Sequence, residues 1–518
     1  MTEPVDPVAP ESRSARHQAR PVRRRRPILR YAAALAVVSL VAGVVAMLSR
    51  DPIDERASAT ASSPAVPGAG GTLHLLSERS VARWDPQRLY GGVESALAVR
   101  LFTRTLTGYL PPAKGVSQLA TDLRPDLATD LGSSTDHRTW RFTIRPDVRW
   151  EDDRPVTCED VRYGISRAFA RDQVTGGAPY PILLIDIPLA KSAQGADIPG
   201  YAGPYDKTGQ SFFDDAVGCS GATLTIRLKV AVPDFPHVVA LPVFAPARAD
   251  RDRGGAGTFD VLSCGPYRLQ SPWQPGTGGT FVRNPHWDRS TDLLRRALPD
   301  EIEVRESLPV GQLVGRIADQ AEDNTTIAIS ELPVSIYGQL SADEALRSRV
   351  TTPSSGNIDF LAPSFKRPPM SNPAVRQAFS MATDRTAYAA AADSALLRPT
   401  FSVLAPIVPG HAEVSPFGTP PSGDPAAAAG VLAAAGIATP VPVRVVYRSS
   451  PAADAGYAAL KVGWERAGFQ VQLEPVTDDY YATVSSSQSA GAYDVFRSAW
   501  FADYPSASVV LPTLFDGR

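Results

Sequence analysis

The stretch Tyr493-Asp494-Val495-Phe496-Arg497-Ser498-Ala499-Trp500-Phe501-Ala502-Asp503-Tyr504-Pro505 is the most informative part of the chain. Its aromatic and β-branched residues predict a strand up to Trp500, and the strand ends at a turn where Asp503 precedes Pro505 by two positions. An indole lowers the local dielectric, so a carboxylate beside it attracts a ligand cation such as an α-ammonium more strongly than it would in bulk water. The alternative interpretation is an Asp that only caps a turn.

The same stretch resembles a segment of the family 5 periplasmic binding proteins, the oligopeptide- and dipeptide-binding receptors of ABC importers. In that family a W-x-x-D element follows a buried strand, and its Asp pairs with the free amino terminus of the peptide. Trp500 and Asp503 match these two positions, and Arg497 falls where the oligopeptide-binding branch carries an Arg that meets a ligand carboxylate. The resemblance therefore implies a ligand site at Asp503, Trp500 and Arg497.

A second block, residues 139–169, follows the family pattern of a strand, a turn and a helix, with Asp153-Arg154 where the family has Asp-Gly. Thr157 suits the cap of this helix because Asp160 follows three residues later. Paired acids in this block resemble the carboxylates of a glycosidase, but the cap and the turn explain them more simply. These acids are Glu151, Asp152, Asp153, Glu159 and Asp160.

A third block, residues 370–385, predicts a helix with Asn372 as its cap and Pro373 in its first turn. In the family the corresponding helix opens the second lobe. The alternation of strands and helices after this point favours an α/β lobe with a mixed sheet.

The resemblance covers about residues 70–518 and implies an α/β, two-lobed periplasmic-binding-protein-like fold of class II type, cluster C, with an extra subdomain. We expect lobe I in residues 71–112 and 223–350, the extra subdomain in residues 113–222, and lobe II in residues 351–518. The family sequence continues beyond the position of Arg518, so we expect an incomplete, C-terminally truncated lobe II.

Three further candidate ligand contacts, Tyr90, Gly92 and Glu94, stand in a predicted loop before the first helix of lobe I. In the family this loop lies next to the ligand cleft. An ordinary surface loop is the alternative for each of the three residues.

The N-terminal region predicts a membrane or export segment. Residues 1–27 form a basic cytoplasmic tail, residues 28–48 a signal anchor or signal peptide, and residues 49–70 a flexible linker rich in Ala, Ser, Pro and Gly. Because Arg residues precede the apolar run, the tail stays in the cytoplasm and the rest of the chain is outside. Usage of Arg and Ala indicates a bacterium, so the folded part is placed on the extracytoplasmic face of the cell membrane, with an uncleaved anchor preferred over cleavage and export.

Charge and motifs exclude several functions. The chain has a formal net charge of −2, while residues 1–30 hold eight Arg and only three acids, so the folded part is acidic and no nucleic acid partner is expected. Neither an HExxH motif nor Cys and His at zinc spacing occurs, which argues against a metal site. The G-x-S-x-G, Walker A and dinucleotide-binding glycine patterns are also missing, so we expect no cofactor and no enzymatic activity.

Three Cys residues permit one disulfide and leave one thiol. We predict the pair Cys158 and Cys219 because both fall in the expected extra subdomain, and we predict a free, buried Cys264. The spacing alone leaves the other two pairings open.

The resemblance implies the substrate-binding component of an ABC importer, a monomer that captures short peptides between its lobes. The peptide would pass to a membrane permease whose ATPase is a separate chain. One alternative keeps the fold and changes the ligand to nickel, heme, an opine or an oligosaccharide. The other is a membrane-anchored sensor or scaffold without transport.

Overall fold

The structure is a computed structural model. It describes residues 68–112, 121–318, 325–329, 334–351, 356–392, 396–485 and 491–515.

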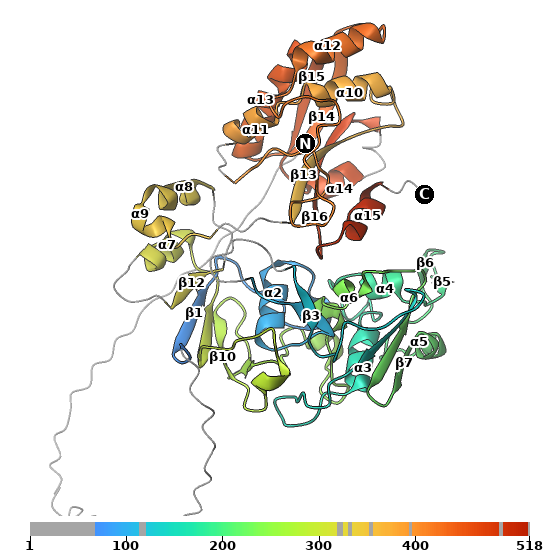
Figure 1. Ribbon diagram of the computed structural model, residues 1–518, viewed down its shortest axis with the longest axis vertical. Coiled ribbons are helices and arrows are strands. Elements are labelled where there is room, and N and C mark those ends of the chain that lie inside the picture. Colours follow the sequence, from blue (N-terminus) through green and yellow to red (C-terminus); the bar gives the residue numbers. More distant parts are fainter. Residues whose placement is uncertain are drawn as a thin grey trace, which may run out of the picture. The chain divides into compact units, whose positions relative to one another are not determined.

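These residues belong to one compact unit and form a mixture of helices and strands (Figure 1). Within them, no helix is both long and apolar enough to cross a membrane. The predicted tail, the predicted membrane segment and nearly all of the linker, residues 1–67, lie outside the described part of the chain.

The first sheet has five strands in the order β12-β1-β11-β10-β9. The strands are β1 (Thr72–Leu76), β9 (Tyr267–Leu269), β10 (Gly278–Arg283), β11 (Glu301–Arg305) and β12 (Thr326–Ala328). β1 pairs in parallel with β11 and β12, whereas β10 pairs antiparallel with β9 and β11. Parallel strands cannot be joined by a tight turn, and here the paired residues Thr72 and Glu301 are 229 positions apart in the sequence.

The core beside this sheet is aromatic. Trp84 is fully buried, and its ring lies edge-on to those of Phe102, Trp273 and Phe281. Two elements follow β1 along the chain, η2 (Pro86–Arg88) and α2 (Gly92–Leu101). Leu89, directly after η2, and Ala98 and Leu101 of α2 belong to the same core. Edge-to-face aromatic pairs of this kind stabilise a core beyond the area that they bury. Three more helices accompany this sheet: α7 (Val310–Ala318), α8 (Val334–Ala342) and α9 (Glu344–Arg347).

A second, antiparallel sheet has the order β4-β8-β7. It consists of β4 (Thr139–Thr143), β7 (Val217–Ser220) and β8 (Thr223–Arg227). The sequence placed residue 223 onward in lobe I, whereas the structure pairs β8 with β4 and β7, which fall in the range expected for the extra subdomain. The alternation of residues 223–227 indicates a strand, but it carries no information about the strand with which they pair.

Several short elements surround the second sheet. They are β2 (Thr107–Tyr109), β3 (Leu123–Pro125), β5 (Leu189–Lys191), β6 (Asp197–Pro199), α3 (Cys158–Arg167), α4 (Tyr180–Leu184), α5 (Gln210–Ala216), α6 (Phe235–Val238), η3 (Pro242–Phe244), η4 (Gly254–Ala256) and η5 (Arg289–Thr291).

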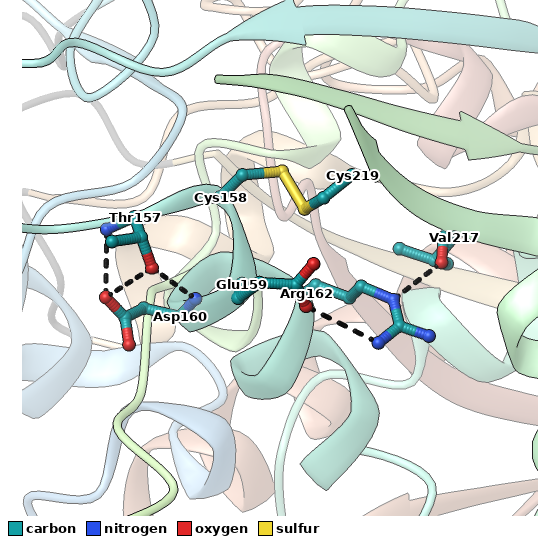
Figure 2. The surroundings of a disulfide bond; sticks show 7 residues. All are labelled: Thr157, Cys158, Glu159, Asp160, Arg162, Val217 and Cys219. Carbon is teal, nitrogen blue, oxygen red and sulfur yellow. Dashed lines mark hydrogen bonds and ion pairs between the residues drawn. A yellow bond between two sulfur atoms is a disulfide. The ribbon is translucent and has the colours of Figure 1, made fainter. Parts of the chain in front are cut away.

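Helix α3 begins with the predicted cap (Figure 2). The Thr157 hydroxyl accepts a hydrogen bond from the Asp160 N–H, and the Asp160 carboxylate accepts one from the Thr157 N–H, so the two residues form a capping box. The next residue, Cys158, is joined by a disulfide to Cys219 on β7, while Cys264 is buried and free. One turn later Arg162 donates a hydrogen bond to the Val217 carbonyl at 2.8 Å. The start of α3 is therefore tied to β7 by a covalent bond and a hydrogen bond.

The third large sheet has the order β13-β16-β14-β15 and contains the stretch quoted first. Its strands are β13 (Asn357–Pro363), β14 (Val441–Arg448), β15 (Phe469–Val476) and β16 (Val495–Phe501). β14 pairs in parallel with β15 and β16, while β13 and β16 are antiparallel. The predicted mixed sheet is therefore confirmed.

Helices pack beside this sheet (Figure 1). They are α10 (Pro373–Met381), α11 (Arg385–Ala391), α12 (Pro425–Ala434), α13 (Pro451–Arg466) and α14 (Tyr480–Ser485). The side chain of Asn372 accepts a hydrogen bond from the Ala374 N–H at 2.9 Å, which confirms the predicted cap of α10. Phe379 of α10 stacks on Trp464 of α13 with ring centroids 4.5 Å apart, in a core separate from that of the first sheet.

After β16 the chain forms η7 (Ala507–Val509) and α15 (Leu511–Phe515). Ala502, Tyr504, Val509 and Val510 are buried in the same apolar cluster as the β4-β8-β7 sheet. The segment that follows β16 therefore leaves the core of its own sheet and packs against the subdomain.

Candidate ligand-binding site

Asp503 stands two residues after the end of β16. The preceding Ala502 N–H donates to the Gly356 carbonyl at 3.1 Å, next to the first residue of β13, so the backbone stays tied to the neighbouring strand as it leaves the sheet. Two tyrosine hydroxyls then donate to the Asp503 carboxylate, Tyr90 at 3.0 Å and Tyr180 at 2.5 Å. Three segments far apart in the sequence thus meet at one carboxylate.

The described part of the chain supplies no cation to the carboxylate of Asp503. No Lys, Arg or His in the described part of the chain forms an ion pair with it. Burial raises the pKa of Asp503 above its ordinary value, and the hydrogen bonds from Tyr180 and Tyr90 oppose that rise. Burial together with the nearby Asp503 charge raises the pKa of Tyr90 to about 12, so its hydroxyl stays a donor at neutral pH. A partly desolvated carboxylate of this kind favours the approach of an external cation.

The two oxygens of this carboxylate differ in their surroundings. Both tyrosine hydroxyls donate to Oδ2. Oδ1 accepts no hydrogen bond from any described residue, and it is not fully buried, so it reaches solvent. The free acceptor capacity of Asp503 is therefore concentrated on Oδ1.

The two tyrosines are held differently. Tyr180 is 9% exposed, and its ring packs on that of Tyr504 with centroids 5.7 Å apart. The Tyr504 ring stacks in turn on His237, whose Nδ1 lies 2.9 Å from the Tyr109 hydroxyl. Tyr90 is 50% exposed. Tyr180 is thus fixed by packing, whereas Tyr90 reaches Asp503 from a solvent-exposed position.

Trp500 lies opposite Ile358 in the register of β16 and β13. Its ring packs against the apolar cluster that contains Ile358 and Ala502, and its Nε1 is buried with no hydrogen-bond partner in the described residues. A buried indole N–H without an acceptor is unusual, because such donors are almost always paired. Trp500 therefore supplies an apolar wall with one unused donor close in sequence to Asp503.

Arg497 lies on the other face of the same strand. Side chains alternate along a strand, so residues 497 and 500 point to opposite faces, and the neighbours agree: Val495 packs in the core with α10 and α13, whereas Trp500 packs in the cluster with the subdomain. The Arg497 guanidinium donates to Asp359 on β13 and, at 3.4 Å, to the Tyr481 hydroxyl. Burial lowers the pKa of Arg497, but Asp359, Tyr481 and Tyr457 together outweigh burial and raise the pKa above its ordinary value. The structure therefore does not bring Arg497 together with Trp500 and Asp503, because strand alternation turns its side chain toward Asp359 and Tyr481.

Gly92 and Glu94 are not in a loop, as the sequence suggested, but in the first turn of α2. Gly91 and Gly92 both have positive φ, 65° and 73°, a conformation that favours glycine and turns the chain sharply after Tyr90. Of the candidates Tyr90, Gly92 and Glu94, the structure brings Tyr90 into contact with Asp503. Sequence reasoning missed Tyr180, which is 323 residues from Asp503 and stands in a segment without a recognised motif.

The acidic residues around α3 have structural partners. Glu151 accepts a hydrogen bond from the Ser263 N–H, and Asp152 pairs with Arg248. Asp160 completes the capping box. The described residues contain no group of three or more His, Cys, Asp or Glu side chains that could hold a metal ion.

Residues 122–518 match the family described as bacterial extracellular solute-binding proteins, family 5 Middle. The chain belongs to this family. Members of family 5 are solute-binding proteins rather than enzymes. Two periplasmic relatives from Escherichia coli illustrate the similarity. The murein peptide-binding protein MppA is 25% identical over 401 residues, which cover 76% of this chain and 70% of MppA. The oligopeptide-binding protein OppA is 22% identical over 461 residues, which cover 86% of this chain and 77% of OppA.

Solved structures agree with the family assignment. The clavulanic acid biosynthesis oligopeptide binding protein 2 superposes with a TM-score of 0.74 at 30% sequence identity, over 87% of this chain and 80% of that chain. The unliganded open form of MppA superposes with a TM-score of 0.64 at 22% identity, over 87% and 82% of the two chains. The family 5 chain therefore has the two-lobed α/β fold of the periplasmic binding proteins.

Proposed function

We propose that this chain is the extracytoplasmic substrate-binding protein of an ABC importer that captures short peptides between its two lobes and delivers them to a membrane permease. The observation that carries the proposal is the Asp503 carboxylate, which is partly buried, is held by two hydroxyls and forms no ion pair with a described residue. Relatives whose names describe murein peptide and oligopeptide binding support the ligand class.

Asp503 takes the α-ammonium of the peptide, and Trp500 forms part of the apolar wall beside it. The main chain of an extended peptide pairs with strand edges, so the identity of its side chains has little effect on affinity. Closure of the lobes removes water from the ammonium and the carboxylate, which strengthens their attraction. Arg497 is already paired with Asp359, so the far carboxylate of the peptide is bound elsewhere.

The finer assignments belong to the same proposal. The fold is the class II type, cluster C variant; lobe I contains residues 71–112 and the returning segment after β8, the extra subdomain lies between them, and lobe II begins near residue 351. The N-terminal apolar segment anchors the protein at the outer face of the bacterial membrane. The protein acts as a monomer, and the permease works with an ATPase on a separate chain.

Calorimetry with matched peptides tests the proposal. Tri-alanine with a free amino terminus and N-acetyl-tri-alanine differ in the one group that Asp503 is proposed to bind. We expect the free peptide to bind at least tenfold more tightly, and Asp503→Asn to remove this preference because it removes the anion. The matched control is Asp172→Asn, which deletes an exposed carboxylate elsewhere and should leave both affinities unchanged.

Native mass spectrometry of the purified protein gives an independent test. A heterogeneous set of co-purified short peptides, lost in Asp503→Asn, supports the proposal. A bound metal ion, heme or sugar, or equal binding of the free and acetylated peptides, would contradict it.

A further inference from the structure

The hydrogen bonds that Asp503 already accepts bear on which kind of cation the site can bind. A carboxylate oxygen has two lone pairs. Oδ2 of Asp503 already accepts from Tyr90 and from Tyr180, whereas Oδ1 accepts from none of the described residues and reaches solvent. The protein thus presents an approaching ligand with one oxygen instead of two.

A single oxygen suits the two common organic cations unequally. An ammonium is a compact point charge that needs one acceptor at short distance. A guanidinium gains much of its affinity for carboxylates from two parallel N–H···O bonds, one to each oxygen. With Oδ2 filled, a guanidinium keeps the charge attraction and loses its second hydrogen bond.

We infer that Tyr90, with Tyr180, makes the Asp503 site selective for a primary ammonium over a guanidinium by occupying the second carboxylate oxygen. The inference rests on the proposed function, since it concerns the cation that the same carboxylate binds. Tyr180 is fixed by its packing on Tyr504, so it also sets the orientation of the carboxylate. Tyr90 is half exposed and comes from a separate segment, which makes its hydroxyl the separable determinant of selectivity.

The test compares tri-alanine with N-amidino-tri-alanine, in which a guanidinium replaces the α-ammonium and the positive charge is kept. Calorimetry with the full-length wild-type protein should show about tenfold or more tighter binding of the ammonium form. In Tyr90→Phe one lone pair of Oδ2 becomes free, so the affinity for the amidino form should rise about three- to tenfold relative to the affinity for the ammonium form. The ratio of the two affinities is the readout, because a purely structural effect would move both affinities together.

Tyr481→Phe is the matched control. Tyr481 is 52% exposed, close to the exposure of Tyr90, and its hydroxyl contacts Arg497 rather than Asp503. We expect this variant to keep the wild-type affinity ratio. Thermal unfolding of both variants without ligand checks that each one is folded.

Each outcome separates the two proposals. Equal binding of both forms by the wild-type protein, or an unchanged ratio in Tyr90→Phe, would overturn the selectivity inference while leaving a peptide site at Asp503. Tighter binding of both forms in Tyr90→Phe would overturn it too, because Tyr90 would then be a competitor of the ligand. If tri-alanine and other free peptides do not bind the wild-type protein at all, the proposed function fails and the inference fails with it.

Discussion

Two aspartates in this molecule show opposite solutions to the burial of a carboxylate. Asp126 is 1% exposed and accepts hydrogen bonds from Arg104 at 2.7 Å and from Arg295 at 2.8 and 3.0 Å. Burial by itself raises its pKa, but the two guanidinium groups outweigh burial and hold the pKa at about 2. Asp503 is half-buried and receives two neutral hydroxyls, so burial prevails and its pKa is raised.

A structural carboxylate and a binding carboxylate can be distinguished by the partners that the fold gives them. A structural carboxylate carries its cations within the fold, because an uncompensated buried charge is costly. A binding carboxylate is left without a cation, and the fold accepts a small loss of stability that the ligand reverses. The loss of stability at Asp503 stays small because Oδ1 still reaches water.

Removal of the Asp126 charge should have the largest effect on stability. Asp126→Asn leaves Arg104 and Arg295 buried without their anion, so we expect a loss of about 3–5 kcal/mol in the free energy of unfolding. Urea denaturation measures this loss. The control, Asp122→Asn, breaks an exposed pair with Arg124 and should cost at most about 1 kcal/mol. A loss below 1 kcal/mol for Asp126→Asn would show that Asp126 is not a stabilising structural carboxylate.

Removal of the Asp503 charge should act on binding instead. We expect Asp503→Asn to weaken binding of a free tripeptide by about 3 kcal/mol, roughly a hundredfold, because the ligand ammonium loses its anion. Without ligand the variant should be as stable as the wild type or slightly more stable, since a desolvated charge is gone. Calorimetry and urea denaturation measure the two quantities. A variant that is strongly destabilised but binds normally would place Asp503 with Asp126 as a structural residue.

The pH dependence of the two aspartates should have opposite signs. The lowered pKa of Asp126 contributes about 2 kcal/mol of stability at neutral pH, which is lost as the pH falls from about 4 to about 2. The raised pKa of Asp503 means that its ionised form slightly destabilises the ligand-free fold, and this penalty disappears as the pH falls through its raised pKa toward 4. Over that same interval peptide affinity should fall, because a protonated Asp503 cannot hold an ammonium. Calorimetry from pH 7 to pH 4 on the wild type and Asp503→Asn checks this: an equal pH dependence in both proteins would contradict it.

Arg497 should give the smallest effect. It is paired with Asp359 on the face of β16 away from Trp500, and both side chains are partly exposed. We therefore expect Arg497→Gln to change tripeptide affinity less than threefold and stability by about 1 kcal/mol or less. Calorimetry and urea denaturation measure both. A loss of affinity comparable to that of Asp503→Asn would show that Arg497 takes part in ligand binding.

Local features of the fold could be predicted from the sequence. The capping box of Thr157 and Asp160 and the cap at Asn372 depend on residues three or fewer positions apart, and both are present. The strand that ends just before Ala502 follows from its aromatic and β-branched residues. Such signals are reliable because the interacting groups are fixed by helix or strand geometry.

Other features depended on contacts across the chain. Residues 223–227 are recognisably a strand, but their hydrogen bonds with β4, rather than their own pattern, place them in the subdomain. The alternation of side chains along β16 was visible in the sequence, yet the partners on each face, which separate Arg497 from Trp500, were not.

By itself the sequence determined the family and the aspartate that we propose as the ligand anchor, because W-x-x-D lies within four consecutive residues. That Tyr90 and Tyr180 meet at one oxygen of this aspartate, while no described residue donates to the other oxygen, became visible in the packed fold. Contacts between segments hundreds of residues apart leave no periodic signal in the sequence, since they arise from how whole elements pack. The chemistry of the proposed site is thus local, while its selectivity is a property of the fold.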